Sequence, residues 1–202
     1  MTGGGKTCAT RRVPRDGWHE TGENRGATFV DMSADQSETT NNADRTEEVR
    51  AAYRRYVELR EQVHAGTTSW STIAEQCFTP DVVFVDPAWG RTEGRDAVAT
   101  FMDESMAGLD DWTFPEDWTM VDGDRVVSFW WNRLPGTRPD GSPNQAPGVS
   151  ILHYAGGGRF DHELDILNLA EVMELIAQSG WRPTGPMNAP PDHPDRNTEP
   201  PG

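Results

Sequence analysis

The sequence of 202 residues lacks several features that define common classes of protein. It has only two cysteines, Cys8 and Cys77, which are too few for a disulfide framework or a zinc site. No apolar run approaches the roughly 20 residues that span a bilayer. The basic N-terminus is not followed by the apolar segment of a secretory signal. We therefore expect a soluble protein of the reducing cytoplasm.

Positive charge is also scarce. The chain has 18 lysine and arginine residues against 33 aspartate and glutamate residues, which gives a net charge of −15 at pH 7. Such a surface repels phosphate backbones and anionic lipids. We expect no nucleic-acid partner and no membrane partner.

Large apolar side chains are rare at both ends of the chain. Residues 1–43 are rich in small and polar residues and predict a disordered N-terminal extension, within which Met32 is a natural start for the folded part. Residues 183–202 are rich in proline and predict a disordered tail. The part between them, residues 44–182, has the length of a single domain.

Within this domain the hydrophobic pattern changes from a helical period to a period of two. Apolar residues at helical spacing predict a helix from Asp44 or Thr46 to Gly66, and shorter helices at 70–78, 95–107 and 168–179. A β-rich run lies at 81–87, and alternating segments near 112–121, 125–133, 148–155 and 159–167 predict four antiparallel strands, with a long loop at 135–147. This order predicts an α+β fold rather than βαβ units.

The order of elements and three short stretches resemble the nuclear transport factor 2-like superfamily, which includes ketosteroid isomerases and SnoaL-like polyketide cyclases. The stretches are Arg55-Tyr56-Val57, Val85-Asp86-Pro87 with the following Gly90 and Gly94–Val98, and Ala146 to Asp165. The resemblance covers residues 50–180. It implies a cone in which three to four helices and a strongly curved antiparallel sheet enclose one pocket.

The resemblance implies that Asp86 is a catalytic base, that Tyr56 donates a hydrogen bond to a developing oxyanion, and that Asp165 is a second acid or base. The residues themselves support Asp86, because a carboxyl group at the end of an apolar strand loses hydration and its pKa rises. The alternative is that Asp86 caps a turn in water. Tyr53 competes with Tyr56, and either could instead pack in the core.

The last predicted strand carries acidic residues at every second position. Asp161, Glu163 and Asp165 share one face, and Phe160, His162, Leu164 and Ile166 share the other. Two carboxyl groups in one pocket would raise each other's pKa and divide the roles of acid and base. Where ketosteroid isomerases have a second aspartate, this chain has Ser150, a weaker proton donor.

Aromatic residues are expected to line the pocket. The predicted substrate contacts come from several elements: Tyr53, Phe84, Trp89, Phe101, Trp131, Ser150 and Glu163. Of the adjacent Trp130 and Trp131, one must face inward because side chains alternate along a strand. His153 and His162 are expected on the outer face of the sheet, where we expect two copies to form a homodimer, and no spacing of histidines indicates a metal.

These observations favour an enzyme that moves protons on a small hydrophobic carbonyl compound, without a metal or nucleotide cofactor. Isomerisation, aldol cyclisation and dehydration all use this chemistry. One alternative is a module of the same fold that binds a hydrophobic ligand or forms a dimeric scaffold without turnover. Another is an epoxide hydrolase, which needs an arginine between two acids, and Arg133 is the only candidate for it.

Overall fold

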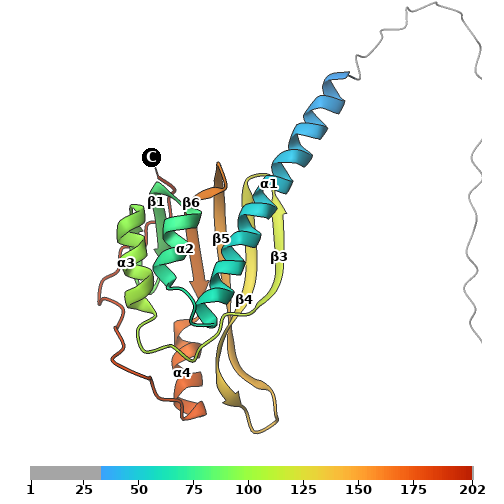
Figure 1. The fold of residues 1–202 in the computed structure, drawn as a ribbon. Helices are drawn as coiled ribbons and strands as arrows, with labels where there is room; N and C mark the ends of the chain where they lie inside the picture. The colour runs from blue at the N-terminus through green and yellow to red at the C-terminus, as the bar shows by residue number, and fades with distance from the viewer. Residues whose placement is uncertain (1–32, 202) are drawn as a thin grey trace, which may run out of the picture.

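The computed structural model describes residues 33–201, with side chains from residue 44 onward. Within this part, a six-stranded curved sheet and four helices form an α+β fold (Figure 1). The helices are α1 (Ser33–His64), α2 (Trp70–Cys77), α3 (Arg95–Ser105) and α4 (Leu169–Ser179). The strands are β1 (Phe78–Asp86), β2 (Gly90–Glu93), β3 (Glu116–Asp122), β4 (Arg125–Thr137), β5 (Pro143–Gly156) and β6 (Arg159–Leu167).

The sheet has the strand order β2-β1-β6-β5-β4-β3. All neighbouring pairs are antiparallel except β1 and β6, which run parallel. The predicted antiparallel meander is confirmed, and the sheet also contains one parallel pair, because α3 and the meander carry the chain back to place β6 beside β1. The short strand β2 was not predicted. Its four residues are too few to show an alternating pattern.

Strands β4 and β5 are longer than predicted. Their ladder continues from Arg133–Gln145 to Thr137–Pro143 across an irregularity, so the predicted long loop shrinks to a tight turn closed by the hydrogen bond from the Arg138 amide to the Ser142 carbonyl. Pro135 lies within this irregularity, where a residue without an N–H can be tolerated in a sheet. Figure 1 shows the resulting hairpin extending beyond α4.

Helix α1 lies across the inner face of the sheet beside α2, and α4 closes one end (Figure 1). The buried stripe of α1 includes Val49, Tyr53, Tyr56 and Leu59, which follow the predicted helical spacing. The helix begins at Ser33 rather than near Asp44, because no glycine or proline interrupts it before Gly66. Residues 33–43 of the predicted disordered extension are therefore helical, and residues 1–32 lie outside the described residues.

Residues 181–201 have no regular secondary structure, as their proline content predicts, but they contact the domain. The Arg91 guanidinium donates to the backbone carbonyls of Asn197 and Glu199, and Arg196 donates to the carbonyl of Pro87. Asn188 donates to the carbonyl of Glu104 on α3. The tail expected to be disordered thus runs along α3 and the β1–β2 edge (Figure 1).

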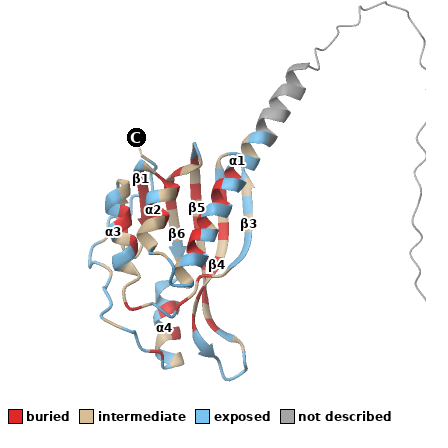
Figure 2. Cartoon of the chain, viewed as in Figure 1, coloured by how far each residue is buried: buried red, intermediate tan, exposed pale blue. Residues whose placement is uncertain are grey.

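Buried and half-buried residues alternate along the central strands of the sheet (Figure 2). On β4 and β5 the inward residues are buried and the outward ones are half-buried, in strict alternation. On the outer face the rings of Trp118, Phe129 and Trp131 pack in series, with centroids 5.6 and 5.2 Å apart. The expected pairing of two copies through this face stays a prediction.

None of the helices in the described part of the chain combines the length and apolar composition that crossing a membrane requires.

Candidate active site

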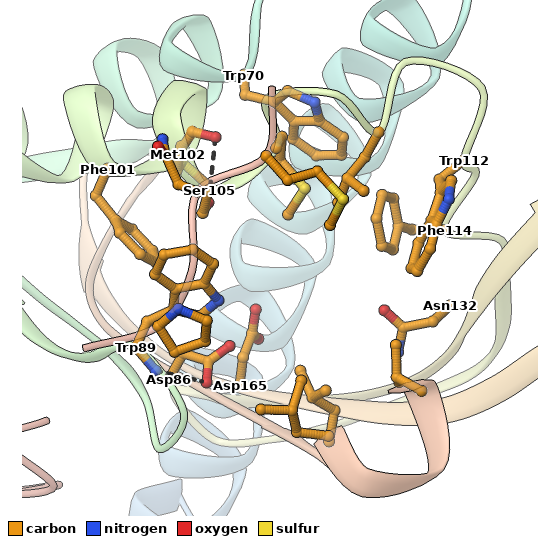
Figure 3. Close-up of a pocket in the computed structure, with 18 of the residues that line it drawn as sticks. Trp70, Asp86, Trp89, Phe101, Met102, Ser105, Trp112, Phe114, Asn132 and Asp165 are labelled. Carbon is orange, nitrogen blue, oxygen red and sulfur yellow. Dashed lines mark hydrogen bonds between the residues drawn. The ribbon is translucent and has the colours of Figure 1, made fainter. Parts of the chain in front are cut away.

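A cavity of about 380 Å³ lies between the helices and the inner face of the sheet (Figure 3). Its walls come from all four helices, from four strands and from the C-terminal tail, and they are mainly apolar. They include seven large apolar aromatic side chains: Trp70, Phe84, Trp89, Phe101, Trp112, Phe114 and Trp130. Polar groups are few, and two of them are carboxyl groups. The cavity therefore offers a ligand a large apolar contact surface and a small number of charged groups.

Asp86 ends β1, whose last five residues are all buried, and its side chain faces the cavity. Its Oδ1 accepts hydrogen bonds from the backbone amides of Ala88 at 2.7 Å and Trp89 at 3.4 Å. Among the described residues, none donates to Oδ2. Burial raises the pKa of Asp86, and the two backbone hydrogen bonds offset part of this rise. Asp86 thus caps a turn, as one interpretation of the sequence predicted, and it also lines the cavity, as the other predicted.

Asp165 projects from β6 into the same cavity, and Figure 3 shows its carboxyl group beside that of Asp86. Its Oδ1 accepts a 2.5 Å hydrogen bond from the Ser150 hydroxyl, which itself accepts one from the Trp130 indole at 2.9 Å. Burial raises the pKa of Asp165 to about 7, and the charge of Asp86 adds to this rise. Near neutral pH, Asp165 can therefore both donate and accept a proton.

Glu163 lies behind the cavity wall rather than in it. Its side chain is fully buried, and its Oε1 accepts a hydrogen bond from the Tyr56 hydroxyl at 3.1 Å. Burial raises the pKa of Glu163 well above its usual range, and the nearby charge of Asp165 raises it further. Both effects favour the protonated form of Glu163.

Of the two tyrosines, Tyr56 lines the cavity and Tyr53 does not. The Tyr53 hydroxyl donates to Glu116 at 2.6 Å, and the two tyrosine rings stack with centroids 5.9 Å apart. Because the Tyr56 hydroxyl already donates to Glu163, it has no second proton to offer an oxyanion. The predicted role of Tyr56 therefore requires this hydrogen bond to exchange.

The structure brings most of the predicted contact residues to the cavity wall: Phe84, Trp89, Phe101 and Ser150. The ring of Phe101 packs 5.4 Å from that of Phe84 and 6.0 Å from that of Trp89. Trp131, also predicted to line the cavity, lies on the outer face of the sheet, and Trp130 lies on the inner face instead. Alternation required one inward tryptophan but could not identify which one.

A β-bulge on β6 changes which residues face inward. His153 pairs with His162 and Tyr154 pairs with Phe160, so Asp161 is the extra residue. Phe160 therefore joins the core on the same side as Glu163, contrary to the simple alternation. His153 and Asp161 interact on the outer face, at 2.7 Å.

Sequence reasoning missed many of the cavity residues, and two of them, Arg60 and Asn132, carry polar side chains that are almost fully buried. Arg60 lies on the same face of α1 as Tyr53 and Tyr56, seven and four residues later, and this spacing was a usable signal. Asn132 follows Trp130 by two positions on β4 and therefore shares its inward face. Arg133, the arginine considered for an epoxide hydrolase, instead donates to Gln145 on the outer face.

The C-terminal tail also contributes to the wall through Met187, Asn188, Ala189 and Pro190. Gly108, with φ of +81°, lets the tail approach closely. A Cβ at this position would lie 3.0 Å from the Gly185 carbonyl oxygen. No pattern in the proline-rich tail indicated this contact.

Comparisons with known proteins agree with this architecture. The family model described as the SnoaL-like domain matches residues 54–162. A structure named as a SnoaL-like polyketide cyclase from Jannaschia sp. CCS1 aligns with a TM-score of 0.52 at 16% identity, covering 80% of this chain and 100% of that one. One named as a polyketide cyclase from Acidithiobacillus ferrooxidans aligns with a TM-score of 0.50 at 19% identity, covering 65% and 95%. No curated protein matches the sequence.

At these identities the solved structures establish the fold and not the reaction. The family model covers more than half of the sequence, from the first helix to the last strand. The chain therefore belongs to the family of proteins with a SnoaL-like domain.

Proposed function

We propose that this protein is an enzyme that moves protons on a hydrophobic carbonyl compound, by isomerisation, aldol cyclisation or dehydration. The observation that carries the proposal is the pairing of Asp86 and Asp165 in one aromatic-walled cavity. Asp86 has a free oxygen and a raised pKa, and Asp165 has a pKa of about 7. These are the properties that a base and an acid need near neutral pH.

In this mechanism Oδ2 of Asp86 removes a proton from the carbon next to the substrate carbonyl. The C–H electron pair moves into the new C=C bond, and negative charge develops on the carbonyl oxygen. Isomerisation follows when a carboxyl group returns the proton to a different carbon. In aldol cyclisation the enolate carbon attacks a second carbonyl, whose oxygen takes a proton from Asp165. In dehydration Asp165 protonates a departing hydroxyl group, which leaves as water.

The test is a screen of cyclic and aromatic ketones for exchange of α-protons with deuterated water, followed by NMR. Asp86→Asn should reduce the rate about 10²- to 10⁴-fold, the usual contribution of a positioned base. Asp81→Asn is the matched control, because Asp81 lies on the same strand but is exposed. Equal rates for the wild type and Asp86→Asn would eliminate Asp86 as the base.

A binding module without turnover is the second candidate. It is favoured by the Tyr56 hydroxyl, which is engaged by Glu163 rather than free to stabilise an oxyanion. In the same NMR screen such a module would show ligand-dependent shifts in the protein but no α-proton exchange with any ketone.

A further inference from the structure

Arg60 on α1 is a buried arginine without a hydrogen-bonding anion. It is 5% exposed, and it lines the cavity. Its Nε and Nη2 atoms have no hydrogen-bond partner, and among the described residues no carboxylate forms an ion pair with it. A guanidinium keeps its charge at any physiological pH, so the cost of burying this charge cannot be removed by loss of a proton.

Leaving such donors unbonded is unfavourable. A buried donor without a partner has lost its bonds to water, and the loss is greater for a charged donor. The neighbouring acids Glu116, Glu163 and Asp165 interact with Arg60 only through space, where its charge lowers their pKa. The charged forms of these acids therefore stabilise the guanidinium without accepting hydrogen bonds from its Nε and Nη2 atoms. Because these two nitrogens have almost no exposed surface, an oxygen from a ligand in the cavity would bond to them after a small rotation of the Arg60 side chain.

Two more buried donors without partners line the same cavity. They are Nδ2 of Asn132, which is 5% exposed, and Nε1 of Trp112, also 5% exposed. Figure 3 shows both residues across the cavity from Asp86 and Asp165. The carboxyl groups of Asp86 and Asp165 and the unpartnered donors of Asn132 and Trp112 thus lie on different sides of the cavity.

We propose that the cavity binds an apolar molecule that carries a carboxylate, which is held by Arg60 with Asn132 as a second donor. A guanidinium matches a carboxylate with two parallel hydrogen bonds, and the aromatic walls accommodate the apolar remainder. This inference rests on the proposed function and narrows its substrate class to hydrophobic oxo acids. The carboxylate at Arg60 would direct the carbonyl end of the molecule towards Asp86.

The test compares aromatic acids with the amides of the same acids, because each pair shares its apolar part and differs only in the head group, an anionic carboxylate or a neutral amide. Calorimetric titration of the full chain with 1-naphthylacetate and indole-3-acetate, and with their amides, should show the acids binding about 10- to 100-fold more tightly. This range corresponds to a charge-assisted hydrogen bond of about 1.5–3 kcal/mol. Arg60→Met should abolish the preference, and Arg60→Lys should keep part of it.

Arg54→Met is the matched control, because Arg54 lies on the same helix but is exposed. It should leave the preference unchanged. If Arg60→Met does not fold, as thermal denaturation would show, Asn132→Ala serves in its place and should weaken the acids more than the amides. Equal affinity for acids and amides, no binding of any acid, or a preference that survives Arg60→Met would overturn the inference.

Asp86→Asn separates this inference from the proposed function. The variant should keep the preference for acids while it loses α-proton exchange. If the acids bind selectively but no oxo acid exchanges its α-protons even in the wild type, the proposed function fails and the carboxylate site stands. If ketones react but acids are not preferred, the carboxylate site fails alone.

Discussion

The two acidic centres of the cavity, Asp86 on β1 and Asp165 with Glu163 on β6, show how partners divide roles that burial alone would make equal. All three carboxyl groups are largely withdrawn from water, and burial raises the pKa of each. Asp86 is held by two backbone amides through one oxygen only. The β6 pair is connected by side chains to Ser150 and Tyr56.

The difference between backbone and side-chain partners determines which carboxyl group can accept a proton from a substrate and which can donate one. The backbone amides fix the position of Asp86 but leave its second oxygen to a substrate. On β6, burial and mutual repulsion favour the protonated form of Glu163, and the pKa of Asp165 is raised to about 7. Asp86 is therefore suited to be the base, and Asp165 to be the group that gives and takes the second proton.

The largest expected effect comes from removing the charge of Asp165. Its pKa is about 7 in the folded protein against a usual 3.8, so the folded state holds a proton that the unfolded state has lost between these pH values. The free energy of unfolding should therefore fall as pH rises from about 4 to 7, by about 4 kcal/mol from this group. Asp165→Asn should lack this part of the fall.

Urea denaturation of wild type and Asp165→Asn at several pH values measures the difference. Asp161→Asn is the control, because Asp161 lies on the same strand but faces outward beside His153. Identical pH dependence of wild type and Asp165→Asn would mean that Asp165 is hydrated, and the contrast between the two acidic centres would then disappear.

A smaller effect is expected from Tyr56→Phe, which tests the connection between Tyr56 and Glu163. Loss of the phenol leaves the buried Glu163 without this donor and should cost about 1–3 kcal/mol of stability. Because the hydroxyl is engaged by Glu163, activity at saturating substrate should fall less than about tenfold, well below the loss in Asp86→Asn. Thermal denaturation and initial rates measure the two quantities.

Tyr53→Phe provides the comparison, since its hydroxyl donates to Glu116 outside the cavity wall. It should leave the rate unchanged. A loss of activity in Tyr56→Phe as large as that in Asp86→Asn would show that Tyr56 acts on the substrate, as the sequence first suggested.

Much of this arrangement could be predicted from local patterns. The end of an apolar strand indicated Asp86, and alternation on β6 placed Glu163 and Asp165 on one face, where the structure has them. The buried stripe of α1 identified Tyr53 and Tyr56. These features depend on the helical or strand period, which a single sequence displays directly.

What could not be predicted depends on contacts between distant segments. The bulge at Asp161 is set by the pairing of β5 with β6, and it reversed the expected side of Phe160. The choice of Trp130 over Trp131 depends on the register of β4. The contact of the tail with Gly108 cannot be predicted from the amino-acid composition of the tail. Arg60 follows Tyr56 by one helical turn, but its burial depends on distant segments that pack around it and could not be predicted from this spacing.

The central claim is that the carboxyl group of Asp86 stands in a desolvated cavity with its pKa raised. Titration of its side-chain carbon by ¹³C NMR in the ligand-free protein tests this most directly, with Asp86→Asn used to assign the signal. We predict a midpoint clearly above the usual value of 3.8, in the direction that burial imposes. A midpoint at or below 3.8 would show a hydrated carboxylate and would contradict the proposed role of Asp86.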